Sequence, residues 1–342
     1  MYIYGIIETN EEKYFGSIGI TADEEVYTIS HKDIAACVSD SLNVNYSSLM
    51  KDTLIKFLMR HQFVIENIMK NYTIIPVKFG TTVSGNEDVQ EVLRKGYREF
   101  KDTLRYINGK IELDIVVSFD DLDSILKEIG EISEIKKFKE EVLSKSSKGT
   151  LEDMIKVGAM VKKVLDRQKN ECNSQILNFL KSEAIEFRRH EVIMDDSMIL
   201  NCAFLLDKNK EREFDQRIKE VDQKFGGRLN FRCIGPLPPY SFSTVEIKKV
   251  EFEALNKAMN TLGLSNKVTQ LEMKKAYRKL AFKYHPDKNL HNPETRSRFA
   301  ELNNAYKLLS LYCHGSKHSF EKEKAGDFIS VRIIKDLMDP RK

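Results

Sequence analysis

The sequence predicts an α+β fold in which a two-lobed N-terminal region precedes a small all-α helical hairpin. Three observations lead to this prediction. Short β-rich runs alternate with amphipathic helical patterns in no regular order over the first half of the chain. A helix–strand–helix–strand series at about residues 150–233 is typical of a ferredoxin-like unit. Beyond residue 252 the apolar spacing is helical. We therefore expect a mixed α+β lobe and a ferredoxin-like lobe, joined by long helices, before the hairpin.

The first lobe opens with strands expected at residues 2–8, 26–29 and 34–38. A helix follows, with apolar residues at three- and four-residue spacing. These are Met50, Leu54, Phe57, Leu58, His61, Val64, Ile65 and Ile68. Because His61 lies on this apolar face, we interpret it as a satisfied core histidine. A buried strand at 74–79, a polar helix at 87–106 and a β-branched strand at 111–119 complete the lobe.

The second lobe begins with an amphipathic helix at 122–143. Thr150 and Asp153 resemble a capping box that opens a long helix ending near Phe187. A strand at 198–206 and a helix at 211–225 follow, and the alternating residues after Gly226-Gly227 predict a last strand.

The bulk composition indicates a soluble protein of a reducing compartment. The chain has 342 residues, and 31% of them are charged. It contains no run of about 18 uncharged apolar residues, so we expect no membrane helix. Its start lacks the basic segment of a signal peptide. Five scattered cysteines without a C-x-x-C pair indicate neither a zinc site nor disulfides. The expected location is the cytoplasm, with reduced thiols.

The net charge of +3 is unevenly distributed. From Phe252 to Cys313 there are eleven Lys or Arg and five Asp or Glu, which gives +6 and leaves −3 for the remainder. A local basic module favours an acidic protein partner over nucleic acid. The expected domains are an N-terminal α+β domain at 1–120, a helical linker plus ferredoxin-like domain at 121–245, the hairpin at 252–313 and a tail at 314–342.

The strongest motif is the run KKAYRKLAFKYHPDKN, which begins at Lys274. Its apolar positions form one stripe at helical spacing. Pro286 disfavours helical geometry at His285 and fixes its own φ near about −65°. His285, Pro286 and Asp287 should therefore lie on an exposed loop that leaves a basic helix. The cations expected on the outer faces of that helix are Lys274, Lys275, Arg278 and Lys279.

A second helix is expected from about residue 293 to about residue 311, antiparallel to the first. Together with FAELNNAYKLLS, the HPD run resembles the J domain of the DnaJ family. The resemblance implies binding of a DnaK-type chaperone and stimulation of its ATP hydrolysis by His285, Pro286, Asp287 and the four cations. Two departures are Ala258-Met259, where many J domains have an aromatic pair, and the lack of a basic final helix. The alternatives are a solvated basic face and an acid–base pair, although no nucleophile or metal set lies nearby in the sequence.

Three stretches of the N-terminal region are distinctive: MYIYGIIE, the run from Arg60 to Val83, and FRCIGPLPPYSF. Through these stretches residues 1–245 resemble the GvpF/GvpL family of gas vesicle proteins, which often has Trp at the position of Leu237. The prolines cannot donate to a β ladder, so we expect them to end a strand. We expect structural roles for two sets of motif residues, which are Pro76, Phe79 and Gly80, and Gly235, Pro236, Pro238, Pro239 and Tyr240.

The resemblance implies a gas vesicle assembly factor, associated with the vesicle, that contacts the hydrophobic shell subunit and limits its aggregation. Other gas vesicle accessory proteins are further expected partners, and neither cofactor, metal, membrane nor nucleic acid is expected. The alternative is a general J-domain co-chaperone with another client. An enzyme is not expected, because the sequence offers no Gly-rich phosphate loop, paired metal ligands or nucleophile motif. In the tail, Phe328, Val331, Ile334 and Met338 predict one helical face that docks on the protein or binds a partner.

Overall fold

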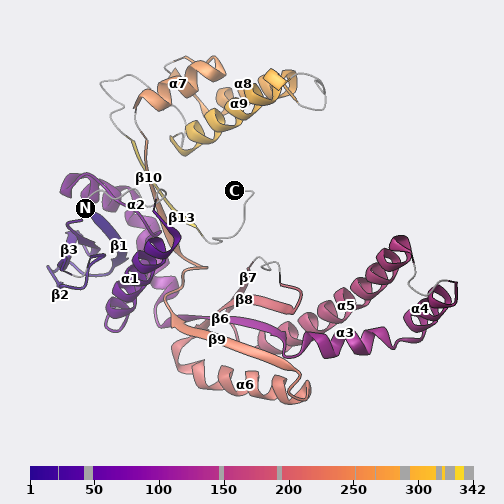
Figure 1. Cartoon of the computed structure of the whole chain (residues 1–342). Coiled ribbons are helices and arrows are strands. Elements are labelled where there is room, and N and C mark those ends of the chain that lie inside the picture. Colours follow the sequence, from indigo (N-terminus) through magenta and orange to yellow (C-terminus); the bar gives the residue numbers. More distant parts are fainter. Residues whose placement is uncertain are drawn as a thin grey trace. The chain divides into compact units, whose positions relative to one another are not determined.

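The computed structural model describes ten stretches of the chain. They are residues 1–21, 23–41, 49–145, 150–190, 195–250, 252–265, 267–285, 293–312, 318–319 and 328–334. The chain divides into two compact units, the first of Met1–Ile65, Val77–Lys101 and Val245–Ile333, and the second of Glu66–Pro76, Asp102–Thr244 and Ile334–Lys342. Figure 1 shows the elements along the chain. In these stretches no helix is both long and apolar enough to cross a bilayer.

The N-terminal sheet is built from short strands in the order β2-β3-β4-β1-β5. Their bounds are β1 (Tyr2–Ile7), β2 (Tyr14–Gly16), β3 (Val26–His31), β4 (Ile34–Ser39) and β5 (Ile74–Pro76). Strand β1 pairs with β4 in antiparallel register, from Tyr2 opposite Ser39 to Ile7 opposite Ala35. Every residue of these two strands is buried, so they form the centre of this core.

Two helices follow the sheet strands in sequence, α1 (Lys51–Met69) and α2 (Asn86–Ile107). The second half of α1 is buried as predicted, with His61, Val64 and Ile65 at most 4% exposed. The apolar face is not buried toward the N-terminal end, where Met50, just before α1, is 80% exposed and Leu58 is 47% exposed. Apolar spacing identifies a face of a helix, but it does not show how far along the helix the core extends.

The second unit contains a four-stranded sheet in the order β7-β8-β6-β9, with antiparallel neighbours throughout. Its strands are β6 (Lys110–Phe119), β7 (Glu186–Arg189), β8 (Met198–Asp207) and β9 (Leu229–Leu237). Helices separate β6 from β7 and β8 from β9, which gives the ferredoxin-like arrangement (Figure 1). The predicted α+β fold is therefore confirmed.

The second unit also contains four helices, α3 (Leu122–Gly130), α4 (Ser133–Lys145), α5 (Leu151–Leu180) and α6 (Glu211–Lys224). A 3₁₀ turn, η2 (Lys208–Lys210), precedes α6. The single helix predicted at 122–143 is wrong. The chain breaks after Gly130, and the break lets Ile129 and Ile135 both enter the core. The long helix ends at Leu180 rather than near Phe187, because the residues that follow pair with β8 as strand β7.

The predicted capping box at the start of α5 is confirmed. The backbone N–H of Asp153 donates to Thr150 Oγ1 at 3.2 Å, and the N–H of Thr150 donates to Asp153 Oδ2 at 3.1 Å. Such a cap stabilises a helix by about 1 kcal/mol. It supplies acceptors to backbone N–H groups at the start of α5 that have no partner within the helix.

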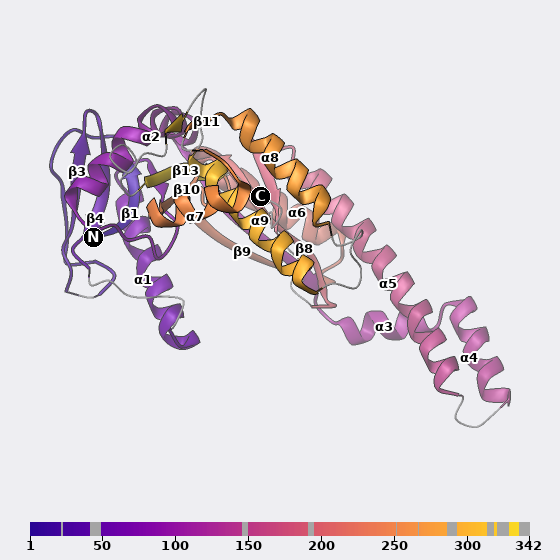
Figure 2. The same ribbon diagram turned by 90° about the horizontal axis from the view of Figure 1, so that it is seen from above.

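Beyond the ferredoxin-like sheet the chain forms strand β10 (Thr244–Val250) and three helices, α7 (Phe252–Leu262), α8 (Gln270–Lys283) and α9 (Pro293–Tyr312). Helices α8 and α9 lie side by side (Figures 1 and 2). One apolar core holds all three together. Its fully or nearly fully buried members are Leu255, Ala258, Met259, Leu262, Val268, Met273, Leu302, Ala305 and Leu309.

The tail returns as strands rather than as the predicted helix. Strand β12 (His318–Ser319) pairs with β11 (Lys267–Val268), and β13 (Phe328–Ile334) pairs with β10. Two of the four residues of the predicted helical face, Val331 and Ile334, are β-branched and therefore also favour a strand. Ile329 on β13 is only 3% exposed, and Met338 lies outside the described residues. The described part of the tail thus docks on the protein as an added strand.

Candidate functional site

Helix α8 carries the HPD run, and its start is fixed by a capping box. Thr269 Oγ1 accepts the backbone N–H of Glu272 at 3.2 Å, and Glu272 Oε2 accepts the N–H of Thr269 at 2.7 Å. One residue later, Met273 is fully buried in the core of the helical module. The capped first turn and the buried methionine together fix the rotation of α8 about its axis.

Contacts with α9 hold the middle of α8 in place. The rings of Tyr277 and Tyr306 stack with their centroids 4.3 Å apart. The Tyr277 hydroxyl donates to Asn303 Oδ1 at 2.7 Å. On α7, Ala258 and Met259 are 4% and 1% exposed, so the two residues that depart from the common aromatic pair still fill this core.

The opposite side of α8 is a basic face, formed by Lys274, Lys275, Arg278 and Lys279. All four side chains are exposed. Their spacing places them along two turns of the helix, where their charges act on a partner together. A concentrated positive field of this kind attracts an acidic surface and raises its association rate by roughly 10- to 10³-fold.

The basic helix ends immediately before the HPD tripeptide. Lys283 is its last residue, and the N–H of Tyr284 closes the final turn on the Leu280 carbonyl at 2.9 Å. His285 is half-buried, with its ring edge-on to Phe299 of α9 at 5.5 Å between centroids. The side chain of His285 is therefore oriented by α9. Pro286 and Asp287 lie outside the described residues.

The second predicted motif, GPLPPYSF, lies at the end of β9. Gly235 has φ +147°, and a Cβ added there would lie 2.5 Å from Leu113 Cδ2 and 2.9 Å from the Glu112 carbonyl oxygen. Any side chain would clash with β6. The peptide bond to Pro236 is cis. This position therefore requires glycine for close approach of the two strands.

The residues after Pro236 fold back on the sheet. The backbone N–H of Ser243 donates to the Pro239 carbonyl at 2.9 Å, and Pro238 and Pro239 are both buried. Phe242, 1% exposed, packs against Ala203 and Leu205 of β8. This segment is therefore a cover for the face of the sheet that carries Ala203 and Leu205.

Tyr240 and Ser241 bring polar groups beneath this cover. Ser241 donates to both carboxylate oxygens of Glu112 on β6, through its N–H at 2.8 Å and its hydroxyl at 2.7 Å. Burial, with smaller contributions from the Glu66 and Glu112 carboxylates, raises the pKa of the Tyr240 phenol. Burial, together with the adjacent Asp114, likewise raises the pKa of Glu112. The segment thus lies over a pair of carboxyl groups, which the sequence motifs did not identify.

The third motif region, around Pro76, Phe79 and Gly80, surrounds a buried histidine. Pro76 ends β5. Gly80 has φ +80°, and its N–H donates to the Tyr2 hydroxyl at 2.9 Å. The Phe79 ring stands edge-on to His61 at 5.6 Å. The turn is thus fixed from its backbone and from its aromatic side chain.

His61 accepts one hydrogen bond and donates another. The Tyr2 hydroxyl donates to Nδ1 at 2.9 Å, because the Nε2–H of the neutral ring is needed for the Val77 carbonyl at 3.1 Å. Burial lowers the pKa of His61 to about 4. The interpretation of His61 as a satisfied core histidine is confirmed.

A buried carboxylate joins β10 to β13. Glu246 is 5% exposed and pairs with Lys78 at 3.1 Å, with Lys248 at 3.3 Å and with Arg332 of β13, whose Nε donates at 2.7 Å. Burial opposes the shift, but the hydrogen bonds from Lys78 and Arg332 lower the pKa of Glu246. These residues are separated by up to 254 positions in sequence, so no local motif predicts this cluster.

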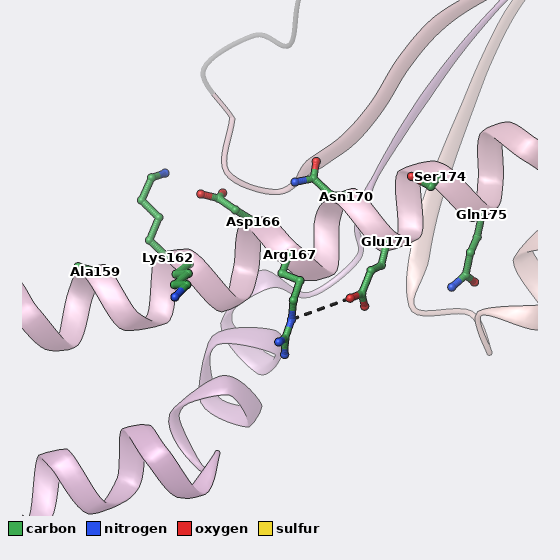
Figure 3. Close-up of a pocket in the computed structure, with 9 residues that line it drawn as sticks. Ala159, Lys162, Asp166, Arg167, Asn170, Glu171, Ser174 and Gln175 are labelled. Carbon is green, nitrogen blue, oxygen red and sulfur yellow. Dashed lines mark ion pairs between the residues drawn. The ribbon is translucent and has the colours of Figure 1, made fainter.

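A shallow depression along α5 has no arrangement suited to catalysis. Its described lining residues come from one face of the helix, and their side chains project from it side by side (Figure 3). Arg167 and Glu171 form an ion pair at 3.9 Å within it. Charges of both signs alternate along the helix without converging, which is typical of a solvated surface.

The family of the chain follows from comparison with known proteins. Residues 1–244 match the model described as gas vesicle synthesis protein GvpL/GvpF. The chain belongs to this family. Residues 251–312 match the model of the DnaJ domain, so this GvpL/GvpF family member also carries a J domain. Strand β10, apart from its first residue, lies between the two matches.

Three relatives illustrate the two parts. Gas vesicle protein F of Microcystis aeruginosa is 25% identical over 221 residues, which cover 63% of this chain and 89% of that protein. The crystal structure of the gas vesicle protein GvpF from Anabaena sp. PCC7120 aligns with a TM-score of 0.58 at 22% identity, over 70% of this chain and 96% of that one. DnaJ homolog subfamily C member 5 of Mus musculus is 53% identical over 51 residues, or 15% of this chain and 26% of that protein.

Both resemblances read from the sequence motifs are therefore confirmed. The GvpL/GvpF match includes the GPLPPYSF segment and the His61 turn, and the J-domain match includes α7, α8 and α9. The likeness to the Anabaena structure supports the fold of the N-terminal part. The basic face of α8 lies within the J-domain match.

Proposed function

We propose that this protein is a gas vesicle assembly factor of the cytoplasm that binds the hydrophobic shell subunit and recruits a DnaK-type chaperone through its J domain. It limits aggregation of the subunit and has no catalytic site of its own. The observation that carries the proposal is the joining of a GvpL/GvpF family region and a J domain in one chain. A protein that shields apolar surface benefits from direct delivery to an ATP-driven chaperone.

The J domain has the features that such delivery requires. The basic face of α8 is exposed, and the helix itself ends at Lys283, two residues before His285. Cationic residues on one face give a fast, salt-sensitive encounter with an acidic partner. Orientation of His285 by Phe299 limits the side-chain entropy lost on binding. The DnaK-type partner would therefore meet α8 first and then engage the HPD loop.

The client surface that we propose lies at the start of α5. Leu151, Met154 and Ile155 are 72%, 57% and 63% exposed. Their spacing places them on adjoining positions of two turns, which creates a continuous apolar stripe in water. Leu143 at the end of α4 is also 60% exposed. A strongly apolar shell subunit is a suitable partner, because covering this stripe removes apolar area from water on both sides.

The test of client binding is a light-scattering assay of the purified shell subunit as it is diluted from denaturant. We expect the wild type to suppress aggregation, and a variant with Leu151→Ser, Met154→Ser and Ile155→Ser to suppress it several-fold less. The matched control replaces Leu271→Ser in α8, which is 77% exposed within the J domain. It should suppress aggregation as the wild type does.

A pull-down from vesicle-forming cells extends this test. Both the full chain and a chain ending before residue 247 should capture the shell subunit, but only the full chain should capture a DnaK-type chaperone. If neither captures the shell subunit while the chaperone is retained, the protein is a general J-domain co-chaperone with another client. That outcome would contradict the gas vesicle role.

A further inference from the structure

We propose that Glu112, Asp114 and His190 form a binding site for one divalent transition-metal ion, most suitably Zn²⁺. One ligand atom from each residue lies within 4.8 Å of the other two. Two carboxylates and an imidazole are a donor set that zinc accepts in proteins. This site is separate from the J domain and from the stripe on α5.

The sheet topology explains how these residues come together. Glu112 and Asp114 are two positions apart on β6, so their side chains leave the same face of the sheet. His190 follows β7, and its backbone N–H donates to the Asn201 carbonyl of β8 at 2.9 Å. Strand β8 lies between β6 and β7, and its residue opposite Asp114 is Ala203. The small alanine leaves room for His190 to reach across to Asp114.

Among the described residues, the basic side chain that pairs with these carboxyl groups is His190, 3.5 Å from Asp114 Oδ1, and it is charged only when protonated. Glu112 is 1% exposed, and its described hydrogen-bond partners are the N–H and hydroxyl of Ser241. Asp114 Oδ1 is fully buried and accepts no hydrogen bond from the described residues. Buried carboxylates without a bound proton or cation are strongly unfavourable. A metal ion would satisfy both carboxyl groups together.

The distance between donor atoms of Asp114 and His190 is compatible with coordination of one metal ion. Asp114 Oδ1 and His190 Nε2 are 3.5 Å apart. Ligand bonds of about 2.0–2.2 Å in a tetrahedral site separate two donor atoms by roughly 3.4 Å. The His190 and Asp114 side chains remain 12% and 27% exposed, which leaves a path for the ion and a fourth position for water.

Ser241 would act on the metal through Glu112. Each oxygen of Glu112 accepts one hydrogen bond from Ser241, and each retains a lone pair for an ion. Hydrogen bonds of this kind orient metal-binding carboxylates. Because Ser241 belongs to the GPLPPYSF segment, a bound ion would also hold that segment against the sheet.

The test uses the full-length protein, stripped of metal with a chelator and titrated with Zn²⁺ against a chromophoric competitor. We expect one ion per chain, and a rise in the thermal midpoint that a chelator reverses. Asp114→Asn and His190→Ala should each weaken this binding at least 10-fold and abolish the thermal shift. The control is Asp207→Asn, at the C-terminal end of β8 opposite Lys110, which should bind as the wild type does.

Two readouts separate a metal site from a structural ion pair. Circular dichroism of each variant verifies its fold, and if Asp114→Asn fails to fold, His190→Ala alone decides the outcome. Co²⁺ should give the visible absorption of a site with low coordination number in the wild type and not in His190→Ala. The proposal is overturned if the wild type binds Zn²⁺ no more tightly than the variants, since His190 and Asp114 then form an ion pair only.

Discussion

At the scale of single residues, two glycines of this chain show how context decides the role of one residue type. Gly235 has φ +147° and lies against β6 without space for a Cβ. Gly158, in α5, has open space where its Cβ would be. The first glycine is therefore required by the fold, whereas the second only lowers the stability of its helix.

We predict opposite effects of alanine at these two positions. Gly235→Ala should lower the free energy of unfolding by about 2 kcal/mol or more, because it combines backbone strain with a steric clash. Gly158→Ala should raise it by about 0.5–1 kcal/mol, because alanine favours a helix interior. Urea denaturation monitored by circular dichroism measures both. Equal effects of the two substitutions would contradict the role assigned to Gly235.

His61 makes a pH-dependent contribution at the same scale. Its pKa in the folded state is about 4, against about 6.5 in an unfolded chain. The unfolded state therefore binds more protons between these values, and stability is lost as the pH falls from 6.5 to 4. The loss attributable to His61 should approach about 3 kcal/mol.

Denaturation of wild type and His61→Gln across this pH range measures that contribution. The variant is less stable at pH 7, because glutamine cannot reproduce both hydrogen bonds of the ring. Its unfolding free energy should nevertheless depend less steeply on pH between 6.5 and 4. Parallel pH profiles for the two proteins would show that His61 is not buried as a neutral group.

At the scale of helices and strands, local signals predicted the elements well and tertiary pairing decided the exceptions. The Thr150 capping box and the HPD break were visible because both depend on neighbouring residues. The break after Gly130 could not be predicted from neighbouring residues, because it depends on core packing. The end of α5 could not be predicted either, because it depends on pairing of β7 with β8. Strand β13 could not be predicted from local signals either, because its partner β10 lies about 80 residues earlier.

The candidate sites follow the same rule. The basic face of α8 could be predicted because helical spacing places its cations together. The cluster of Glu112, Asp114 and His190 could not, because its members come from strands separated by β8. The only local signal was the Glu-x-Asp pattern on a buried β-branched strand. It indicated that Glu112 and Asp114 share one face of the sheet, but it did not identify His190.

For α8 itself, the charges should control the rate of partner association. Lys275→Glu combined with Arg278→Glu should slow binding of a DnaK-type chaperone about 10-fold or more at low ionic strength. The difference should shrink as salt is added, because exposed charges are screened. Lys162→Glu combined with Lys163→Glu on α5 is the control of equal charge change. Stopped-flow association rates measure the effect, and equal slowing in both variants would exclude a specific role of α8.

At the scale of the whole molecule, the two family regions of the chain differ in net charge. The J domain carries +6 over 62 residues, and the remainder carries −3. The GvpL/GvpF region supplies a large α+β scaffold with apolar side chains exposed on α5, and the J domain supplies a cationic surface. In the proposed function, the first part would hold the apolar client and the second would engage the chaperone.

The most direct measurement is the single-turnover ATP hydrolysis rate of a DnaK-type chaperone from the same organism with added protein. We predict that the wild type accelerates hydrolysis at least several-fold and that Asp287→Asn abolishes this acceleration while leaving the helical content unchanged. The substitution removes the negative charge of the Asp287 side chain and hardly changes its size. A hydrolysis rate that stays flat with the wild type, or that rises equally with Asp287→Asn, would contradict the co-chaperone function.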